Sequence, residues 1–283
     1  MADKNYLHTA YANSADGTDG FTTVYPNLNL ITDTKLFTDG KTASASKKGQ
    51  VVVNGNATVT SLAGFNYATF TSQGSQNQDW LRLFLIPDTG TPLMDKTEVL
   101  PNSKYTFSFF AKGTGTHRII AYKDWAVAPN NFMDITLSSD WKLYTLTVTS
   151  MATIPTFNVS FFFRSGIAGS VISVMKPKVE PGSTATPWMP SASEVTTADW
   201  PKYVGTYVDT NPVSSTDLSK YDWDEIKYRV YLDSVAVGGS KLLSFDLENL
   251  KAGTTYNVQV NQINGTDESD KSESVAFKTT LTK

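Results

Sequence analysis

Short segments rich in β-branched and aromatic residues recur along most of this chain, and turn-forming residues separate them. Residues 80–86 (WLRLFLI) and 105–111 (YTFSFFA) are apolar on both faces, as expected of strands inside a sandwich. Other strand-like segments span residues 50–53, 66–72, 117–122, 132–137, 141–148, 157–164 and 170–179. No segment of any length shows a helical period. The pattern predicts an all-β chain with a jelly-roll β-sandwich in its middle.

Composition supports this class and excludes several functions. The 283 residues are long enough for about two domains, and only 18% are charged while 12% are aromatic. The net charge of −3 argues against nucleic acid and against an anionic membrane as partners. The absence of cysteine excludes disulfides and thiolate-held zinc. No apolar run approaches the ~18 residues that span a bilayer, so we expect no membrane insertion.

The end of the central module lies in residues 178–191 (KVEPGSTATPWMPS). The strand pattern breaks at Pro181 and Gly182, and the two later prolines lack the N–H that a ladder needs. Trp188 is expected to form a lid packed on the module's end. The module is therefore predicted to span residues 26–190. A connector with further strands, among them residues 202–209, follows over residues 191–227.

Residues 228–283 resemble the second half of a fibronectin type III domain. The run from Leu247 through Leu250, Gly253 and Thr254 to Tyr256 predicts a corner in which the tyrosine hydroxyl reaches back to the backbone. About 55 residues are too few for such a domain, which needs about 90 to 100. The N-terminal arm, residues 1–25, contains one strand that cannot be stable alone. We expect it to pack with the C-terminal region, so that residues 1–25 and 199–283 form one smaller fibronectin type III-like β-sandwich.

Aromatic and planar polar side chains are the strongest functional signal. A sugar ring stacks its C–H face on an aromatic ring, and its hydroxyls bond to Arg, Asn, Asp or Lys. Residues 121–132 (AYKDWAVAPNNF) form a loop in which Trp125 could offer such a face; the alternative is that this indole fills the core at the sheet end. Strand alternation adds residues on sheet faces. The predicted saccharide-binding residues are Trp80, Arg82, Tyr122, Lys123, Asp124, Trp125, Asn130, Phe132 and Arg164.

The exit sequence resembles the GSTATPW-P-S end of carbohydrate-binding jelly-roll modules in phage tail and baseplate proteins. In outline the chain is similar to accessory baseplate proteins of lactococcal-type siphophages. The resemblance implies a protein of the virion baseplate that binds host cell-wall saccharide and other baseplate proteins. It also implies a structural calcium ion near the first and last strands, where Asp33 and Glu180 are the acids with suitable oxygen ligands.

Enzymatic chemistry has little support in the sequence, and no catalytic residue is predicted. A glycosidase needs two carboxyl groups about 5 to 10 Å apart, and no pair of acids stands out. His8 and His117 are distant in sequence and lack a metal-binding spacing. We therefore expect a binding protein without enzymatic activity. A glycan hydrolase of the tail and a structural spacer without ligand remain the alternatives.

Overall fold

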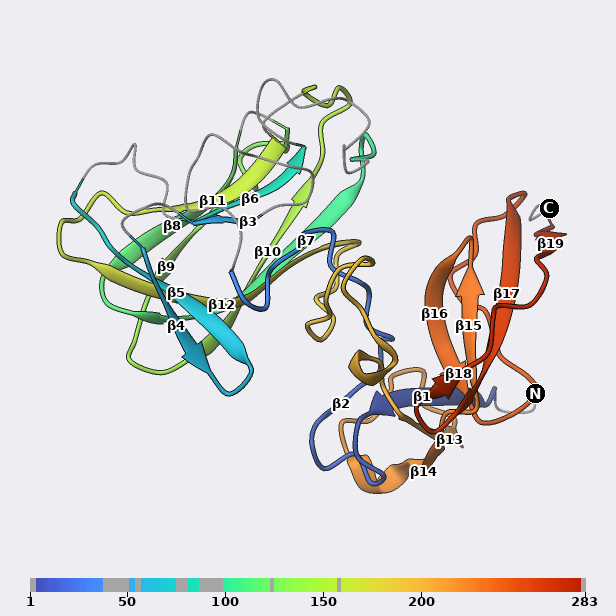
Figure 1. Ribbon diagram of the computed structural model, residues 1–283. Helices are drawn as coiled ribbons and strands as arrows, with labels where there is room; N and C mark the ends of the chain where they lie inside the picture. The colour runs from blue at the N-terminus through green and yellow to red at the C-terminus, as the bar shows by residue number, and fades with distance from the viewer. Residues whose placement is uncertain are drawn as a thin grey trace. The chain divides into compact units, whose positions relative to one another are not determined.

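The computed structural model describes residues 4–37, 51–53, 57–74, 81–86, 99–122, 125–156 and 159–280. The chain forms two compact units (Figure 1). The jelly-roll unit comprises residues 28–195, and the discontinuous unit combines residues 1–27 with residues 196–283. Secondary structure in the described residues is almost entirely β, which confirms the predicted fold class. Within these residues, no helix has the length and apolar character needed to cross a membrane.

Two five-stranded antiparallel sheets build the jelly-roll unit. Sheet I has the order β3-β6-β11-β8-β9, and sheet II has the order β10-β7-β12-β5-β4. The strands of sheet I are β3 (Val51–Val53), β6 (Leu81–Ile86), β8 (Thr116–Tyr122), β9 (Phe132–Thr136) and β11 (Val159–Arg164). Those of sheet II are β4 (Thr58–Leu62), β5 (Phe65–Thr71), β7 (Lys104–Gly113), β10 (Lys142–Thr149) and β12 (Val171–Pro181).

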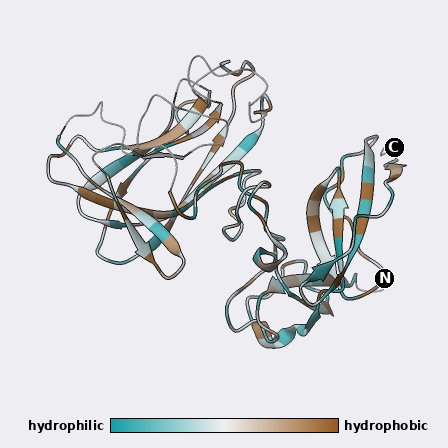
Figure 2. Ribbon diagram, in the orientation of Figure 1, coloured by the Kyte–Doolittle hydropathy of each residue, from teal (hydrophilic) through white to brown (hydrophobic). Residues whose placement is uncertain are grey.

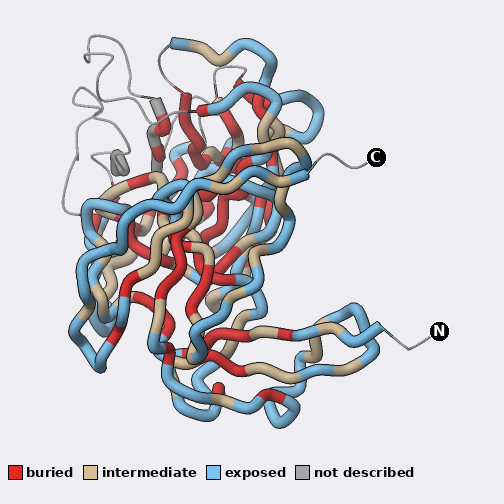
Figure 3. Tube along the Cα trace, turned by 90° about the vertical axis from the view of Figure 1, so that its right-hand side faces the viewer, coloured by how far each residue is buried: buried red, intermediate tan, exposed pale blue. Residues whose placement is uncertain are grey.

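Alternating side chains from the two sheets form one apolar core. Phe107 and Phe109 of β7 meet Phe161 and Phe163 of β11, with ring centroids 4.9 to 5.8 Å apart. All four rings are fully buried. Figure 2 shows apolar segments along these strands, and Figure 3 shows that buried residues concentrate on strands while connections stay exposed. The period-two pattern of the sequence therefore fixes which side chains face inward.

The exit segment, residues 182–191, folds back over part of the outer face of sheet II. It covers Lys178 and Glu180, which are fully buried with Nζ and Oε2 3.2 Å apart. Lys178 Nζ donates to Thr186 Oγ1 at 2.6 Å and to the Pro187 carbonyl at 2.8 Å. Glu180 accepts hydrogen bonds from the Thr186 N–H and hydroxyl. Trp188 packs edge-on to Phe65 at 5.1 Å, which confirms it as a lid.

The discontinuous unit contains two further sheets. Sheet III has the order β14-β13-β1-β2, and sheet IV has the order β16-β15-β17-β18 with β19 paired to β17. The strands of sheet III are β1 (Tyr6–Ala12), β2 (Phe21–Thr22), β13 (Tyr203–Asp209) and β14 (Asp222–Glu225). Those of sheet IV are β15 (Tyr228–Leu232), β16 (Val235–Ser240), β17 (Thr255–Asn264), β18 (Asp267–Glu268) and β19 (Val275–Lys278).

Strands from the two ends of the chain complete sheet III. β1 pairs with β13 over its whole length, from Tyr6 opposite Asp209 to Ala12 opposite Tyr203. Short 3₁₀ helices η2 (Thr197–Asp199) and η3 (Leu218–Lys220) flank β13. The N-terminal arm thus pairs with residues about 200 positions later in the chain.

Polar and aromatic contacts hold the discontinuous unit together. Tyr25 stacks on Trp200 at 5.5 Å, and its hydroxyl accepts a hydrogen bond from Arg229. Arg229 is buried and forms an ion pair with Glu268. The predicted tyrosine corner is present, because Tyr256 Oη accepts a hydrogen bond from the Lys251 N–H at 2.9 Å. This local bond fixes the entry into β17.

Candidate functional site

The candidate site is the face of sheet I that points away from the core. Along β11, Val159, Phe161 and Phe163 point inward, so the alternate residues Phe162 and Arg164 belong to the other face. The register places Arg82 of β6 opposite Phe162. Tyr122 of β8 lies opposite Ser160 on the same side. Four residues from three neighbouring strands therefore share one face.

Arginine and aromatic side chains alternate on this face. The Tyr122 and Phe162 rings lie 4.5 Å apart. The Arg164 guanidinium lies 4.4 Å from the Phe162 ring centre, and that of Arg82 lies 5.3 Å from it. Both guanidinium groups are also within 5.7 Å of the Tyr122 ring. Phe162 is fully buried, so it is the base on which the partly exposed Arg82, Tyr122 and Arg164 rest.

The same face continues across β8 and β9. Arg118 donates two hydrogen bonds to Asp134, at 2.8 and 2.7 Å, and its guanidinium lies 4.1 Å from the Phe132 ring centre. These bonds lower the pKa of Asp134 and raise that of Arg118. Phe132 itself is 36% exposed. Arg118 was missed by the sequence analysis, although its alternation with Ile120 and Tyr122 in THRIIAY places it on the same face.

This arrangement can hold a sugar by two kinds of contact. Partly exposed rings accept the apolar C–H face of a pyranose, and guanidinium groups stacked on rings are held in a fixed orientation. An oriented guanidinium donates paired hydrogen bonds to vicinal hydroxyl or carboxylate oxygens. Of the predicted residues, the structure brings together Arg82, Tyr122, Phe132 and Arg164. Asn130 is exposed in the turn before β9.

Trp125 is the main correction. Its side chain is fully buried, it meets Phe161 edge-on at 5.2 Å, and its Nε1 donates to the Ser160 carbonyl at 3.2 Å. Backbone hydrogen bonds from Met151 and Val127 tie this segment to the end of β10 and direct the indole inward. The prediction of an exposed stacking platform at Trp125 is therefore wrong, and the alternative of a core indole holds. Trp80, Lys123 and Asp124 lie outside the described residues.

The surroundings of Glu180 do not fit its predicted role as a calcium ligand. Both carboxylate oxygens of Glu180 accept hydrogen bonds from Thr186, and the Lys178 ammonium lies beside one of them. A cation already occupies the position that calcium would need, so Glu180 does not fit as a calcium ligand. Asp33 has a left-handed backbone (φ 59°), and its N–H donates to Glu194. The described residues contain no group of three or more acidic, histidine or cysteine side chains suited to a metal ion.

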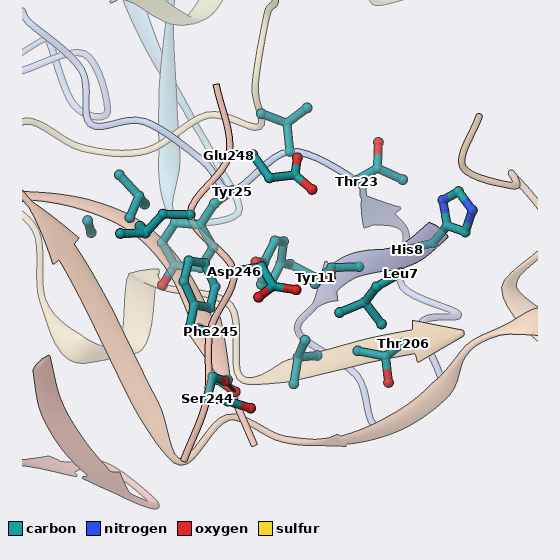
Figure 4. Close-up of a pocket in the computed structure, with 18 of the residues that line it drawn as sticks. Leu7, His8, Tyr11, Thr23, Tyr25, Thr206, Ser244, Phe245, Asp246 and Glu248 are labelled. Atoms are coloured by element: carbon teal, nitrogen blue, oxygen red, sulfur yellow. Dashed lines mark hydrogen bonds between the residues drawn. The ribbon is translucent and has the colours of Figure 1, made fainter. Parts of the chain in front are cut away.

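A pocket of about 500 Å³ lies between sheets III and IV of the discontinuous unit. Figure 4 shows the rings of Tyr11, Tyr25 and Phe245 gathered near the carboxylates of Asp246 and Glu248. Burial raises the pKa of the Tyr25 hydroxyl to about 12, and burial also raises that of Tyr11. These hydroxyls stay protonated at neutral pH and can donate hydrogen bonds. The pocket rim carries exposed apolar side chains, namely Leu7, Val24 and Leu242.

Two of the pocket's rings pack tightly against Gly238 of β16. A Cβ atom at Gly238 would lie 2.2 Å from the Phe245 ring and 3.0 Å from the Tyr11 hydroxyl. Glycine is therefore needed there because β16 and the 241–249 loop approach closely. His8 is one of the lining residues, and its Nε2 lies 3.0 Å from Asp209 while its ring stacks on Tyr207. Its contacts with Asn211 and Ser214 also connect it to the turn after β13.

Comparisons with known proteins identify the family. Residues 201–259 match the family described as minor structural protein 5-like, C-terminal domain (BppU-like). A solved structure, the tripod (BppUct-A-L) from the baseplate of bacteriophage Tuc2009, contains a chain that is 47% identical. The match covers 100% of both chains with a TM-score of 0.72.

Weaker matches fall on carbohydrate-binding modules, and no curated protein matched the chain significantly. A structure described as "CBM4 structure and function" is 19% identical over 44% of this chain and 78% of its own, with a TM-score of 0.32. The CBM22-1 xylan-binding domain from Paenibacillus barcinonensis Xyn10C is 10% identical over 57% and 99%, with a TM-score of 0.33. The Tuc2009 chain, by contrast, is identical to this chain at 47% of positions over the full length of both. The chain therefore belongs to the same family of phage baseplate proteins.

Proposed function

We propose that the chain is a baseplate component that binds host cell-surface saccharide through sheet I, without catalysis. The supporting observation is that Arg82, Tyr122, Phe132 and Arg164 come from four strands and converge on one face. Rings and oriented guanidinium groups on a sheet match the two faces of a sugar, one apolar and one hydroxylated. The relative in the Tuc2009 baseplate supports the first part of this proposal, a role in the virion baseplate.

The chemistry of the same face favours binding over hydrolysis. Glycoside hydrolysis needs two carboxyl groups, one of which has a raised pKa and acts as the acid. Among the described strands of sheet I, Asp134 is the one acidic residue, and hydrogen bonds from Arg118 lower its pKa. A carboxylate held in this state is a poor general acid. The alternative of a tail hydrolase therefore finds no support on this face.

The test is binding of the full chain to an array of host cell-wall polysaccharides. We expect weak binding by single chains and firm binding by whole particles, because repeated copies raise the effective concentration. Arg164→Gln and Tyr122→Ala should each weaken binding about tenfold, since each removes one oriented contact. Lys251→Gln, on the other unit, is the matched control and should change nothing.

Three results would contradict this assignment. Unchanged affinity in both sheet I variants would move the site elsewhere, and an array without any bound polysaccharide would favour the structural spacer. Release of reducing ends during incubation would instead favour the hydrolase. Thermal unfolding of each variant checks that the fold is intact.

We also infer that the discontinuous unit joins the chain to other baseplate proteins. Leu242 and Leu243 in the loop after β16 are 61% and 92% exposed, beside Leu7 at the pocket rim. Adjacent exposed leucines are the kind of apolar patch that marks a protein contact. The double variant Leu242→Asp/Leu243→Asp should fold but fail to enter assembled baseplates. Normal incorporation of that variant would place the contact on another surface.

A further inference from the structure

The outer face of sheet II carries a second group of aromatic and basic side chains, separate from the sheet I face. The exit segment covers the part of this face around Lys178, and its Trp188 packs edge-on against Phe65. It leaves the remaining part without a cover among the described residues. Across the uncovered part, Tyr67 lies opposite Met175, Met175 opposite Phe110, and Phe110 opposite Leu143. Leu143 is 54% exposed, and the other three are partly exposed.

Two lysines converge on one aromatic ring at the end of this face. Lys176 Nζ lies 4.0 Å from the ring centre of Phe65, and Lys35 Nζ lies 5.4 Å from the same centre. Among the described residues, neither ammonium has a carboxylate partner. Burial and the charge of Lys35 both lower the pKa of Lys176. Two cations held over one ring repel each other, and an anion between them would relieve that repulsion.

The backbone around Lys176 is shaped to present its side chain. Lys176 has a left-handed conformation (φ 50°), and the register of β12 shifts at the bulge between Met175 and Lys178. A bulge redirects a side chain out of the regular alternation. Without it, Lys176 would point into the core beside Val174. The sequence therefore maintains an unfavourable backbone conformation that turns this partly buried side chain toward the outer face of sheet II.

A third lysine extends the same chemistry along the sheet. Lys112 Nζ lies 5.0 Å from the Trp141 ring centre and 5.8 Å from that of Tyr67, and the two rings meet edge-on at 5.5 Å. Phe65 and Tyr67 are two residues apart on β5, about 7 Å. The outward-facing residues of β4 and β5, and those of β12 before its bulge, include no acid. The face thus offers rings in a row with cations at both ends.

We propose that this surface, defined by Lys35, Phe65, Tyr67, Lys112, Trp141 and Lys176, binds a saccharide chain that carries phosphate or carboxylate groups. The rings match sugar C–H faces, and lysine ammonium groups bind phosphate as point charges. A protein partner is a poorer match, because lysine is depleted in protein interfaces. The surface is distinct from the sheet I face and does not depend on it.

The test compares dextran of one length in three forms: unmodified, phosphorylated and carboxymethylated. The full chain should bind one or both anionic forms more tightly than unmodified dextran, and added salt should reduce the difference. In the double variant Lys35→Gln/Lys176→Asn, the ratio of the affinity for anionic dextran to that for unmodified dextran should fall roughly 3- to 30-fold. Asparagine is chosen because it tolerates the left-handed backbone. If the double variant unfolds, the exposed Lys35→Gln alone carries the test.

Two controls separate this proposal from general charge effects and from the sheet I function. Lys251→Gln/Lys278→Gln removes the same charge from the other unit and should leave the preference intact. Arg164→Gln should weaken binding of neutral host polysaccharide without changing the anionic preference. The proposal is overturned if wild type shows no anionic preference, if the lysine control loses it equally, or if Arg164→Gln abolishes it. A protein that fails to bind neutral host polysaccharide but keeps the anionic preference would contradict the sheet I proposal and leave this one intact.

Discussion

The buried pair of Lys178 and Glu180 gives the sharpest prediction about stability. Both side chains are fully buried beneath the exit segment, and the lysine also holds Thr186 and Pro187. Lys178→Met keeps the volume and removes the ammonium group that lies 3.2 Å from the buried Glu180 carboxylate. Removing one partner of a buried pair costs about 3 to 5 kcal/mol. In a unit of this size, each kcal/mol lowers the melting temperature by roughly 2 to 4 °C, so we expect a drop of about 6 to 20 °C.

A second variant isolates the cause. Lys178→Met/Glu180→Gln removes both charges, and the amide can still accept a hydrogen bond from the Thr186 N–H. Because a buried pair contributes little net stability compared with neutral groups, this variant should lie within about 2 kcal/mol of wild type. Calorimetry and denaturant unfolding of the full chains give the double-mutant cycle. The reasoning fails if the single variant unfolds within about 1 kcal/mol of wild type, or if the second substitution adds to the damage.

The same pair predicts a pH dependence with a definite sign. Burial lowers the pKa of Lys178 to about 8, against the attraction of Glu180, whereas an unfolded lysine titrates near about 10.4. Between these values the unfolded chain holds more protons, so stability of the jelly-roll unit rises with pH in that window. Denaturant unfolding at pH 7.5 and 9.5 should show this rise in wild type and its loss in Lys178→Met/Glu180→Gln. Equal pH dependence in the two proteins would refute it.

Three further predictions concern packing. Trp125→Ala should cost about 3 to 5 kcal/mol of unfolding free energy with unchanged saccharide affinity per folded molecule, and weaker binding at normal stability would restore Trp125 to the site. Deleting residues 1–25 removes β1 from the middle of sheet III, so limited proteolysis should degrade residues 196–283; cooperative unfolding of that region alone would contradict the shared domain. Tyr256→Phe should cost about 1 kcal/mol through the lost Lys251 bond, and no change in denaturant midpoint would remove the corner's role.

The structure could be predicted from the sequence where it depends on residues that are close together in the chain. Alternation in TFNVSFFFR places Phe161 and Phe163 on one face and Arg164 on the other, because side chains two residues apart on a strand point the same way, and the two phenylalanines are indeed buried. The tyrosine corner was likewise predictable, since its hydrogen bond spans only five residues. The prolines on either side of Trp188 lack the N–H that a strand ladder needs. The end of the last strand was therefore predictable from this segment alone.

Long-range contacts account for the errors. Trp125 follows two charged residues in the sequence, and its burial depends on hydrogen bonds to residues 149 and 151, which no local pattern indicates. Glu180 was assigned to calcium as an acid at a strand end, but the exit segment returns and places Thr186 against it. The pairing of Arg118 with Asp134 depends on the register between β8 and β9, and a sequence alone does not determine register.

The two ends of the jelly-roll unit lie together, and this shortens the loop that separates the two halves of the discontinuous unit. Asn29 and Ser191 form a parallel bridge, and the Asn29 carboxamide bonds to the backbone of Ile31, Pro177 and Val179. Entry and exit of this unit are thus fastened side by side once it has folded. Strands β1 and β13 are separated by roughly 190 residues, and a folded jelly roll shortens the effective loop to about 30. By loop-closure entropy this shortening favours sheet III by about 1.6 kcal/mol. The closed ends of a folded jelly-roll unit therefore stabilise the pairing of two distant halves into the unit that carries the baseplate family match.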